Sequence, residues 1–107
     1  MTTINLRMSC DEPMARVNGR LLKKDTSEGG SGEYEPVPGF EHLGLSHVKH
    51  QELSLPKGAY AYQFTIQDMG AKVEISLVEQ PTKKEIAKGE FTPELPVSHV
   101  FALRFEV

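Results

Sequence analysis

Residues 55–79 decide the fold of this chain, and they read LPKGAYAYQFTIQDMGAKVEISLVE. Both halves of the stretch alternate apolar residues with small or polar ones, and the apolar positions are Tyr60, Tyr62, Phe64, Ile66, Val73, Ile75 and Leu77. A period of two places such residues on one face of a β-strand. The polar turn Asp68–Gly70 separates the halves, so the stretch predicts a half-buried antiparallel hairpin.

Outside the hairpin, shorter alternating runs between turn-forming residues predict further strands. They are expected over residues 2–8, 15–22, 47–55, 85–91 and 99–107, with a short amphipathic turn over residues 40–46. The apolar last strand is expected inside a sheet, with a neighbour on each side. Seven or eight short strands and no helical stripe predict an all-β fold, a two-sheet antiparallel β-sandwich of immunoglobulin-like or jelly-roll-like type.

The inward positions of these strands supply enough large apolar side chains for one core. The predicted core residues are Ile4, Leu6, Val17, Tyr60, Phe64, Ile66, Val73, Ile75, Leu77, Phe101, Leu103 and Phe105. Two glycines interrupt the strands. Gly19 predicts a bulge or a close neighbouring backbone, and the opposite parity of Ile86 and Phe91 predicts a bulge near Gly89.

The corner before the hairpin has a specific pattern. Leu55, Gly58 and Tyr60 resemble the tyrosine corner of immunoglobulin-like sandwiches, in which a Tyr after a tight corner hydrogen-bonds to upstream backbone. Tyr62 would then take the position that holds a core cysteine in antibody domains. The chain departs from the immunoglobulin plan, because three predicted strands follow the corner strand instead of one. The resemblance implies an architecture and carries no function.

Length and composition restrict the classes of protein. At 107 residues, the chain is expected to form a single domain over residues 1–107. Charged residues make up 25% and hydrophobic residues 38%, which is typical of globular proteins. The net charge is −3 and the basic residues are dispersed, so nucleic acid is not an expected partner.

One segment differs from the rest in composition. Residues 25–39 are rich in Gly, Ser and Pro, and they predict a long flexible loop. Tyr34, Val37 and Phe40 are the apolar residues in or beside it. They either pack against the domain and hold the second half of the loop in place, or stay exposed to bind a partner. Packing is favoured, because large apolar side chains are usually buried.

The single cysteine and the N-terminal residues indicate in which cellular compartment the protein is expected. The single cysteine, Cys10, excludes an internal disulfide and fits a reducing compartment. No neighbouring cations suggest a reactive thiol, so Cys10 is expected to be a small buried or edge residue. Residues 1–8 lack a signal-peptide block, and no stretch approaches a membrane span. The sequence predicts a cytoplasmic protein, or a leaderless secreted or assembly-associated one.

Histidines are the candidates for metal chemistry. His42, His47 and His50 fall within nine residues. On an extended strand, however, His47 and His50 point to opposite faces, and zinc sites usually carry tighter sets of Cys and His. The loop carboxylates do not form an Asp-x-Asp-x-Asp calcium array. The histidines are therefore expected to be solvated edge residues, and no metal or cofactor is predicted.

No motif for catalysis stands out. The serines lack a Gly-x-Ser-x-Gly elbow, and the glycines at 29–32 open no helix and precede no lysine, so they form no phosphate cradle. The chain has no Trp for stacking on sugars, so glycan binding rests on fold analogy alone. An enzyme is not predicted.

With metal binding and catalysis not predicted, the remaining class of function is binding to other molecules through the sheet surfaces and strand edges. The outward positions of the hairpin are small and uncharged, which permits close approach by another sheet or chain, and Val100 and Ala102 could extend this face. The candidate interaction residues are Tyr34, Phe40, Ala61, Gln63, Thr65 and Ser76. The sequence thus predicts a non-enzymatic interaction module that binds protein, including copies of itself. Two alternatives stay open: a glycan- or small-ligand-binding module assisted by calcium, and a small metal-dependent enzyme that uses the histidine cluster.

Overall fold

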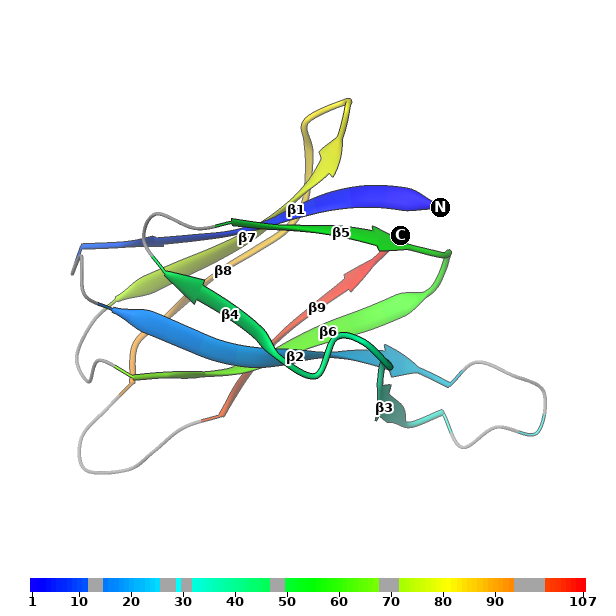
Figure 1. The fold of residues 1–107 in the computed structure, drawn as a ribbon, viewed down its shortest axis with the longest axis horizontal. Helices are drawn as coiled ribbons and strands as arrows, with labels where there is room; N and C mark the ends of the chain where they lie inside the picture. The colour runs from blue at the N-terminus through cyan, green and yellow to red at the C-terminus, as the bar shows by residue number, and fades with distance from the viewer. Residues whose placement is uncertain (12–14, 26–28, 30–31, 47–49, 68–71, 94–99) are drawn as a thin grey trace.

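The fold is known from a computed structural model, which describes residues 1–11, 15–25, 29, 32–46, 50–67, 72–93 and 100–107. These residues form nine β-strands and no helix (Figure 1). The strands are β1 (Thr2–Cys10), β2 (Arg16–Lys24), β3 (Tyr34–Pro36), β4 (Leu43–Ser46), β5 (His50–Leu55), β6 (Ala59–Ile66), β7 (Val73–Gln80), β8 (Lys84–Phe91) and β9 (Phe101–Glu106).

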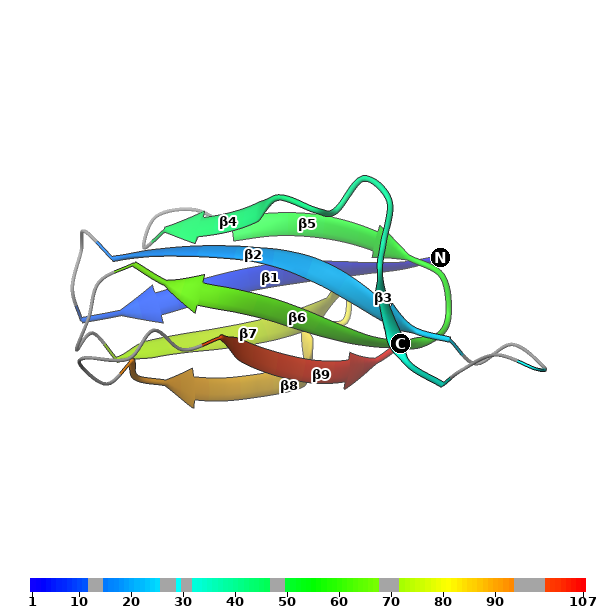
Figure 2. The ribbon, with the colours of Figure 1, turned by 90° about the horizontal axis from the view of Figure 1, so that it is seen from below.

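The strands build two antiparallel sheets that pack face to face, which confirms the predicted all-β two-sheet sandwich. Sheet A has the order β5-β1-β7-β8. Sheet B has the order β3-β2-β6-β9. β4 pairs with the first half of β2, on the same side of β2 on which β3 pairs with its end. Figure 2 shows the two layers one behind the other, with β8 and β9 along one side.

The predicted central hairpin is wrong. β6 lies in sheet B between β2 and β9, whereas β7 lies in sheet A between β1 and β8. The alternating pattern gives each strand one apolar face. The apolar faces of β6 and β7 pack toward each other across the core, and the two strands do not lie side by side in one sheet. The six residues from Gln67 to Lys72 therefore connect one layer to the other.

Two further expectations about strands, their number and the neighbours of the last strand, need correction. The count is nine among the described residues, because β3 falls inside the predicted loop 25–39 and β4 replaces the predicted turn at residues 40–46. The predicted strand 47–55 is seen from His50 onward, and residues 47–49 lie outside the described part. Among the described strands, β9 is an edge strand that pairs with β6 alone, not a strand with two neighbours. β3 and β4, with three and four residues, show too few alternations to be recognised as strands from their period.

The core is filled as the parity predicted. Ten of the twelve predicted core residues are buried, and Phe101 and Leu103 are half-buried because β9 is at the edge. Phe64 contacts Phe91 edge-to-face and lies against Phe101, so three rings close the side of the sandwich between β8 and β9. At ~1.5–3 kcal/mol for each fully buried large side chain, this core is the main force for folding.

The tyrosine corner is present. The hydroxyl of Tyr60 donates a hydrogen bond to the backbone oxygen of Pro56 at 2.8 Å. Gly58 and Val107 exchange backbone hydrogen bonds at 3.2 and 3.0 Å, which ties the corner to the end of β9. The three strands β7, β8 and β9 follow the corner strand β6, as predicted.

Gly19 faces the ring of Tyr62. A Cβ built at Gly19 would lie 2.6 Å from the ring carbons, so only glycine leaves room for the ring. The ring crosses β2, and its buried hydroxyl donates to the backbone oxygen of Leu43 at 2.6 Å. The predicted close approach at Gly19 is thus made by a side chain, and β2 keeps a regular register with no bulge.

The bulge predicted near Gly89 lies three residues earlier. Leu77 pairs with Ala87 and Val78 pairs with Glu85, so Ile86 is the extra residue of β8. Gly89 is instead covered by the ring of Phe91, 2.7 Å from the position of a Cβ. The parity change between Ile86 and Phe91 correctly predicted a bulge in this strand. The predicted position was wrong, because it was assigned to Gly89.

Gly19→Ala is expected to destabilise the protein by about 1–3 kcal/mol, because the methyl group overlaps the Tyr62 ring and overpacking of a close-packed core is costly. Urea unfolding followed by circular dichroism measures the change. Gly44→Ala is the matched control: the nearest atom to its Cβ is 3.5 Å away, in ordinary contact, so the change should be within about 1 kcal/mol. Equal losses in the two variants would contradict the role of Gly19.

Candidate functional site

The second half of the predicted flexible loop is pinned to the body. Val37 donates from its backbone to Leu21 at 3.0 Å, and Leu21 donates to the backbone oxygen of Phe40 at 3.0 Å. Val37 and Phe40 also pack against the core. The described part of the loop from residue 32 onward therefore extends sheet B, and Phe40 serves as an anchor more than as a free contact residue.

Tyr34 is held by a cation. The Arg104 guanidinium carbon lies 5.5 Å from the centre of the Tyr34 ring. Leu22 and Ala61, which lie between the strands that carry Tyr34 and Arg104, face outward yet are buried. We infer that the two long side chains meet above them and cover them.

The candidate residues of the supposed hairpin face do not form one surface. Ala61 is only 3% exposed and offers no contact area. Ser76 lies on β7 in sheet A, on the opposite side of the molecule from Gln63 and Thr65 on β6. The separation follows directly from the two strands lying in different sheets.

Gln63 and Thr65 remain together on the outer face of sheet B. Arg20 lies opposite Gln63 and donates to its side-chain oxygen at 2.9 Å, and Asn18 lies opposite Thr65. Val100 is 65% exposed beside them. These residues border a shallow hollow of about 290 Å³, which is lined by Asn18, Gly19, Arg20, Glu41, His42, Gln63, Phe64, Thr65 and Val100.

The hollow adjoins the free edge of sheet B. Among the described strands β9 pairs with β6 only, through a register that places Ala102 opposite Gln63 and Arg104 opposite Ala61. Along the other side of β9, no described strand pairs with the N–H and C=O groups that every second residue directs away from β6. Ala102 and Val100 beside this edge are uncharged and exposed.

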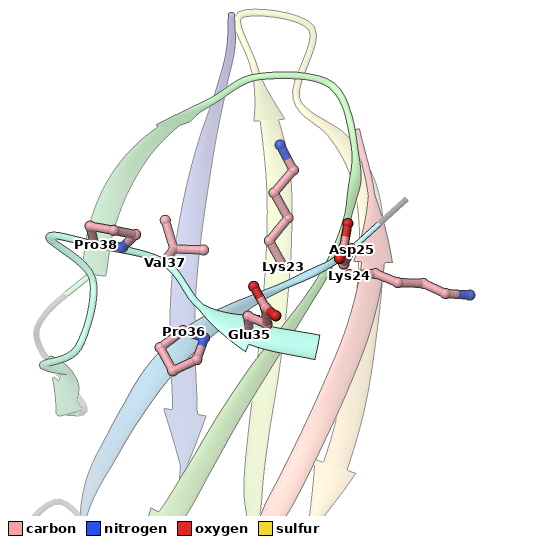
Figure 3. Close-up of a pocket in the computed structure, with 7 residues that line it drawn as sticks. All are labelled: Lys23, Lys24, Asp25, Glu35, Pro36, Val37 and Pro38. Atoms are coloured by element: carbon pink, nitrogen blue, oxygen red, sulfur yellow. The ribbon is translucent and has the colours of Figure 1, made fainter. Parts of the chain in front are cut away.

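A larger hollow of about 460 Å³ lies beside β3 (Figure 3). Its lining side chains diverge: Lys24 points away from Val37 and Pro38, and the Lys23 ammonium lies over the Tyr60 ring at 5.6 Å from its centre. Two lysines and two carboxylates mix without converging on one point. This arrangement suits solvated surface charges rather than a ligand.

The structure separates the histidines it describes. His42 borders the hollow on sheet B, whereas His50 is on the outer face of sheet A opposite Arg7. His47 and His99 lie outside the described residues. Among the described side chains, no group of three His, Cys, Asp or Glu is close enough to hold a metal ion. Cys10 is buried, as expected.

The candidate surface could be recognised only in part from sequence. Val100 and Ala102 stood out as an extension of the flat face, and their place at a free edge did not, because a strand's pairing partners leave no local signal. No pattern in the sequence marks Asn5 as unusual. Its side-chain oxygen is buried in the outer face of sheet A and, among the described residues, has no hydrogen-bond partner.

Comparisons with known protein families, curated proteins and solved structures find no match. Within the described residues, no helix has the length and hydropathy needed to cross a bilayer. The residues and their geometry therefore carry the functional argument.

Burial of Tyr62 predicts a pH effect. Desolvation raises the pKa of the Tyr62 phenol above its ordinary value of 10. The folded state thus keeps this proton where the unfolded chain releases it, and stability present below pH 10 should fall as pH rises further, by about 1.4 kcal/mol per unit.

Urea unfolding measured across this alkaline range tests the effect. Tyr62→Phe should lose this part of the slope, whereas Tyr34→Phe, at a half-buried surface position, should keep it. A slope in Tyr62→Phe as steep as that of the parent would contradict the assignment.

Proposed function

We propose that this protein is a non-enzymatic interaction module that associates with protein through the free edge of sheet B, and that a second copy of the chain is its partner. The observation that carries the proposal is the edge of β9 with which no described strand pairs, together with the exposed side chains of Val100 and Ala102. An exposed strand edge is a template for adding another strand.

The other sheet edges are better protected. β8, the edge of sheet A on the same side, has four charged residues among eight, Lys84, Glu85, Lys88 and Glu90. Two of them form ion pairs with residues on or just before β7, Lys88 with Glu74 at 3.5 Å and Glu90 with Lys72 at 3.2 Å. Charged side chains of this kind discourage strand addition.

The remaining edges are polar or short. β5 exposes His50, Glu52 and Ser54, and the far side of sheet B is divided between the short strands β3 and β4. β9 has only Arg104 and Glu106 as charged residues and alternates cleanly along its length. It is therefore the edge on which a second strand meets the least opposition.

The sequence of β9 is compatible with pairing to itself. An antiparallel pair of β9 strands centred on Leu103 places Ala102 opposite Arg104 of the partner subunit, and Val100 opposite Glu106 of the partner subunit. No like charges face one another, and a small residue faces each long one. Cross-strand neighbours on one face contact directly, so this register is favourable.

Ala102→Lys is expected to weaken dimerisation by about 2- to 30-fold, because two symmetry-related Lys–Arg pairs would repel at ~0.2–1 kcal/mol each. Ala102→Glu is the matched control, since its carboxylate would face the guanidinium and should preserve or strengthen the dimer. Both side chains are exposed, so thermal midpoints should stay unchanged. Sedimentation velocity over a concentration series measures the dissociation constants.

Two results would contradict the proposal. A parent protein that stays monomeric up to roughly millimolar concentration excludes self-association of useful strength. A dimer that is equally stable in Ala102→Lys and Ala102→Glu excludes the β9 edge as its interface.

A further inference from the structure

A third hollow lies on the outer face of sheet A, whereas the proposed β9 interface is on sheet B. It has a volume of about 450 Å³, within the range of small-ligand sites. Its lining is polar and consists of Thr3, Asn5, Arg7, Glu52, Gln80, Pro81 and Lys83.

The wall of this hollow is made by the end of the β7–β8 hairpin. The extra residue Ile86 forms a bulge in β8, and a bulge bends its strand and increases the local twist. Figure 1 shows the β7–β8 turn rising beyond β1 instead of continuing in the plane of the sheet. Gln80 pairs with Thr3 at the end of the β1–β7 ladder, and Pro81 and Lys83 in the turn beyond it complete the lining of the hollow.

Asn5 lies in this hollow. It sits on β1 between Glu52 on β5 and Val78 on β7, on the outer face of the sheet, yet it is only 8% exposed. Its Oδ1 atom is buried and has no hydrogen-bond partner among the described residues, and no other buried side-chain nitrogen or oxygen there is in this state. A buried acceptor without a donor is costly, and most buried polar atoms in folded proteins have a partner, so a ligand that donates to this oxygen would remove a real cost.

The groups around Asn5 define what would complement it. The Asn5 oxygen and the Glu52 carboxylate accept hydrogen bonds, whereas Arg7 and Lys83 donate and carry positive charge. Two cations against one carboxylate leave the hollow positive on a chain whose net charge is −3. A ligand that fits must therefore donate to the two acceptors and bring an anion to the two cations.

We propose that this hollow binds an acidic saccharide. Sugar hydroxyls would donate to Asn5 and Glu52, and the sugar carboxylate would accept from Arg7 and Lys83. Hydroxyl groups donate and accept at once, so they match a lining in which both kinds of group alternate. Arg7, Glu52 and Lys83 are exposed, and these long side chains can move aside to let a hydroxyl reach the Asn5 oxygen.

Calorimetric titration of the full chain at low salt tests the proposal with a galacturonic acid tetrasaccharide, with the neutral maltotetraose and with inorganic phosphate. The acidic saccharide should bind at least about tenfold more tightly than the neutral one and should weaken as salt rises. Equal binding of both saccharides, no binding of either, or displacement by phosphate at equal concentration would each overturn the proposal, the last by showing a simple anion site.

Asn5→Val separates a binding role from a structural one. Removing the unpartnered oxygen should leave the thermal midpoint unchanged or raise it, while binding of the acidic saccharide falls by about tenfold or more. A lower midpoint with binding retained would show that Asn5 only supports the fold.

Arg7→Gln keeps the test decisive if Asn5→Val folds poorly, because Arg7 is exposed. It should weaken binding of the acidic saccharide by about tenfold and leave the weak binding of maltotetraose unchanged. Lys24→Gln, an exposed lysine on sheet B, is the control and should change neither. Equal binding by Arg7→Gln and Lys24→Gln would overturn the site.

Discussion

The close packing of the Tyr62 ring on Gly19 is the contact on which sheet B depends. The ring starts on β6, crosses β2 where that strand has no side chain, and ends with its hydroxyl on the backbone of β4. One side chain thus fixes three strands, one of which is too short to hold its place by ladder hydrogen bonds alone. The hydroxyl is paired within the core, where an unpaired polar group would be costly.

Period-two alternation specifies which face of a strand is buried, and it says nothing about the strand's neighbours. This is why Tyr60, Phe64, Val73 and Leu77 are buried as predicted while β6 and β7 are not a hairpin. A sandwich gives two strands with matching apolar faces a choice between lying side by side and facing each other across the core. The tyrosine corner could be predicted because its donor and acceptor are four residues apart, within reach of local sequence.

The candidate surface was predictable only where burial follows parity. Gln63 and Thr65 face outward and stay accessible, as their positions suggested. Ala61 has the same parity, yet it is covered by side chains from β3 and β9, which are remote in sequence. Small residues on a sheet face permit close approach of other groups. Here we infer that the space above Ala61 is filled by Tyr34 and Arg104 of the same chain.

For the proposed self-association, the arrangement of edges would favour a closed dimer over a fibre. Pairing of two β9 strands about a twofold axis uses the same edge on both copies and leaves none of that kind free. An open array would need β9 to pair with the opposite edge of sheet B. That edge is split between β3 and β4, and β3 is three residues long and ends at Pro36, which has no N–H to donate. Sheet A cannot extend the array on its β8 side either, because ion-paired charges line that strand. If β9 pairs with a second copy as proposed, the same features would limit that association to two copies.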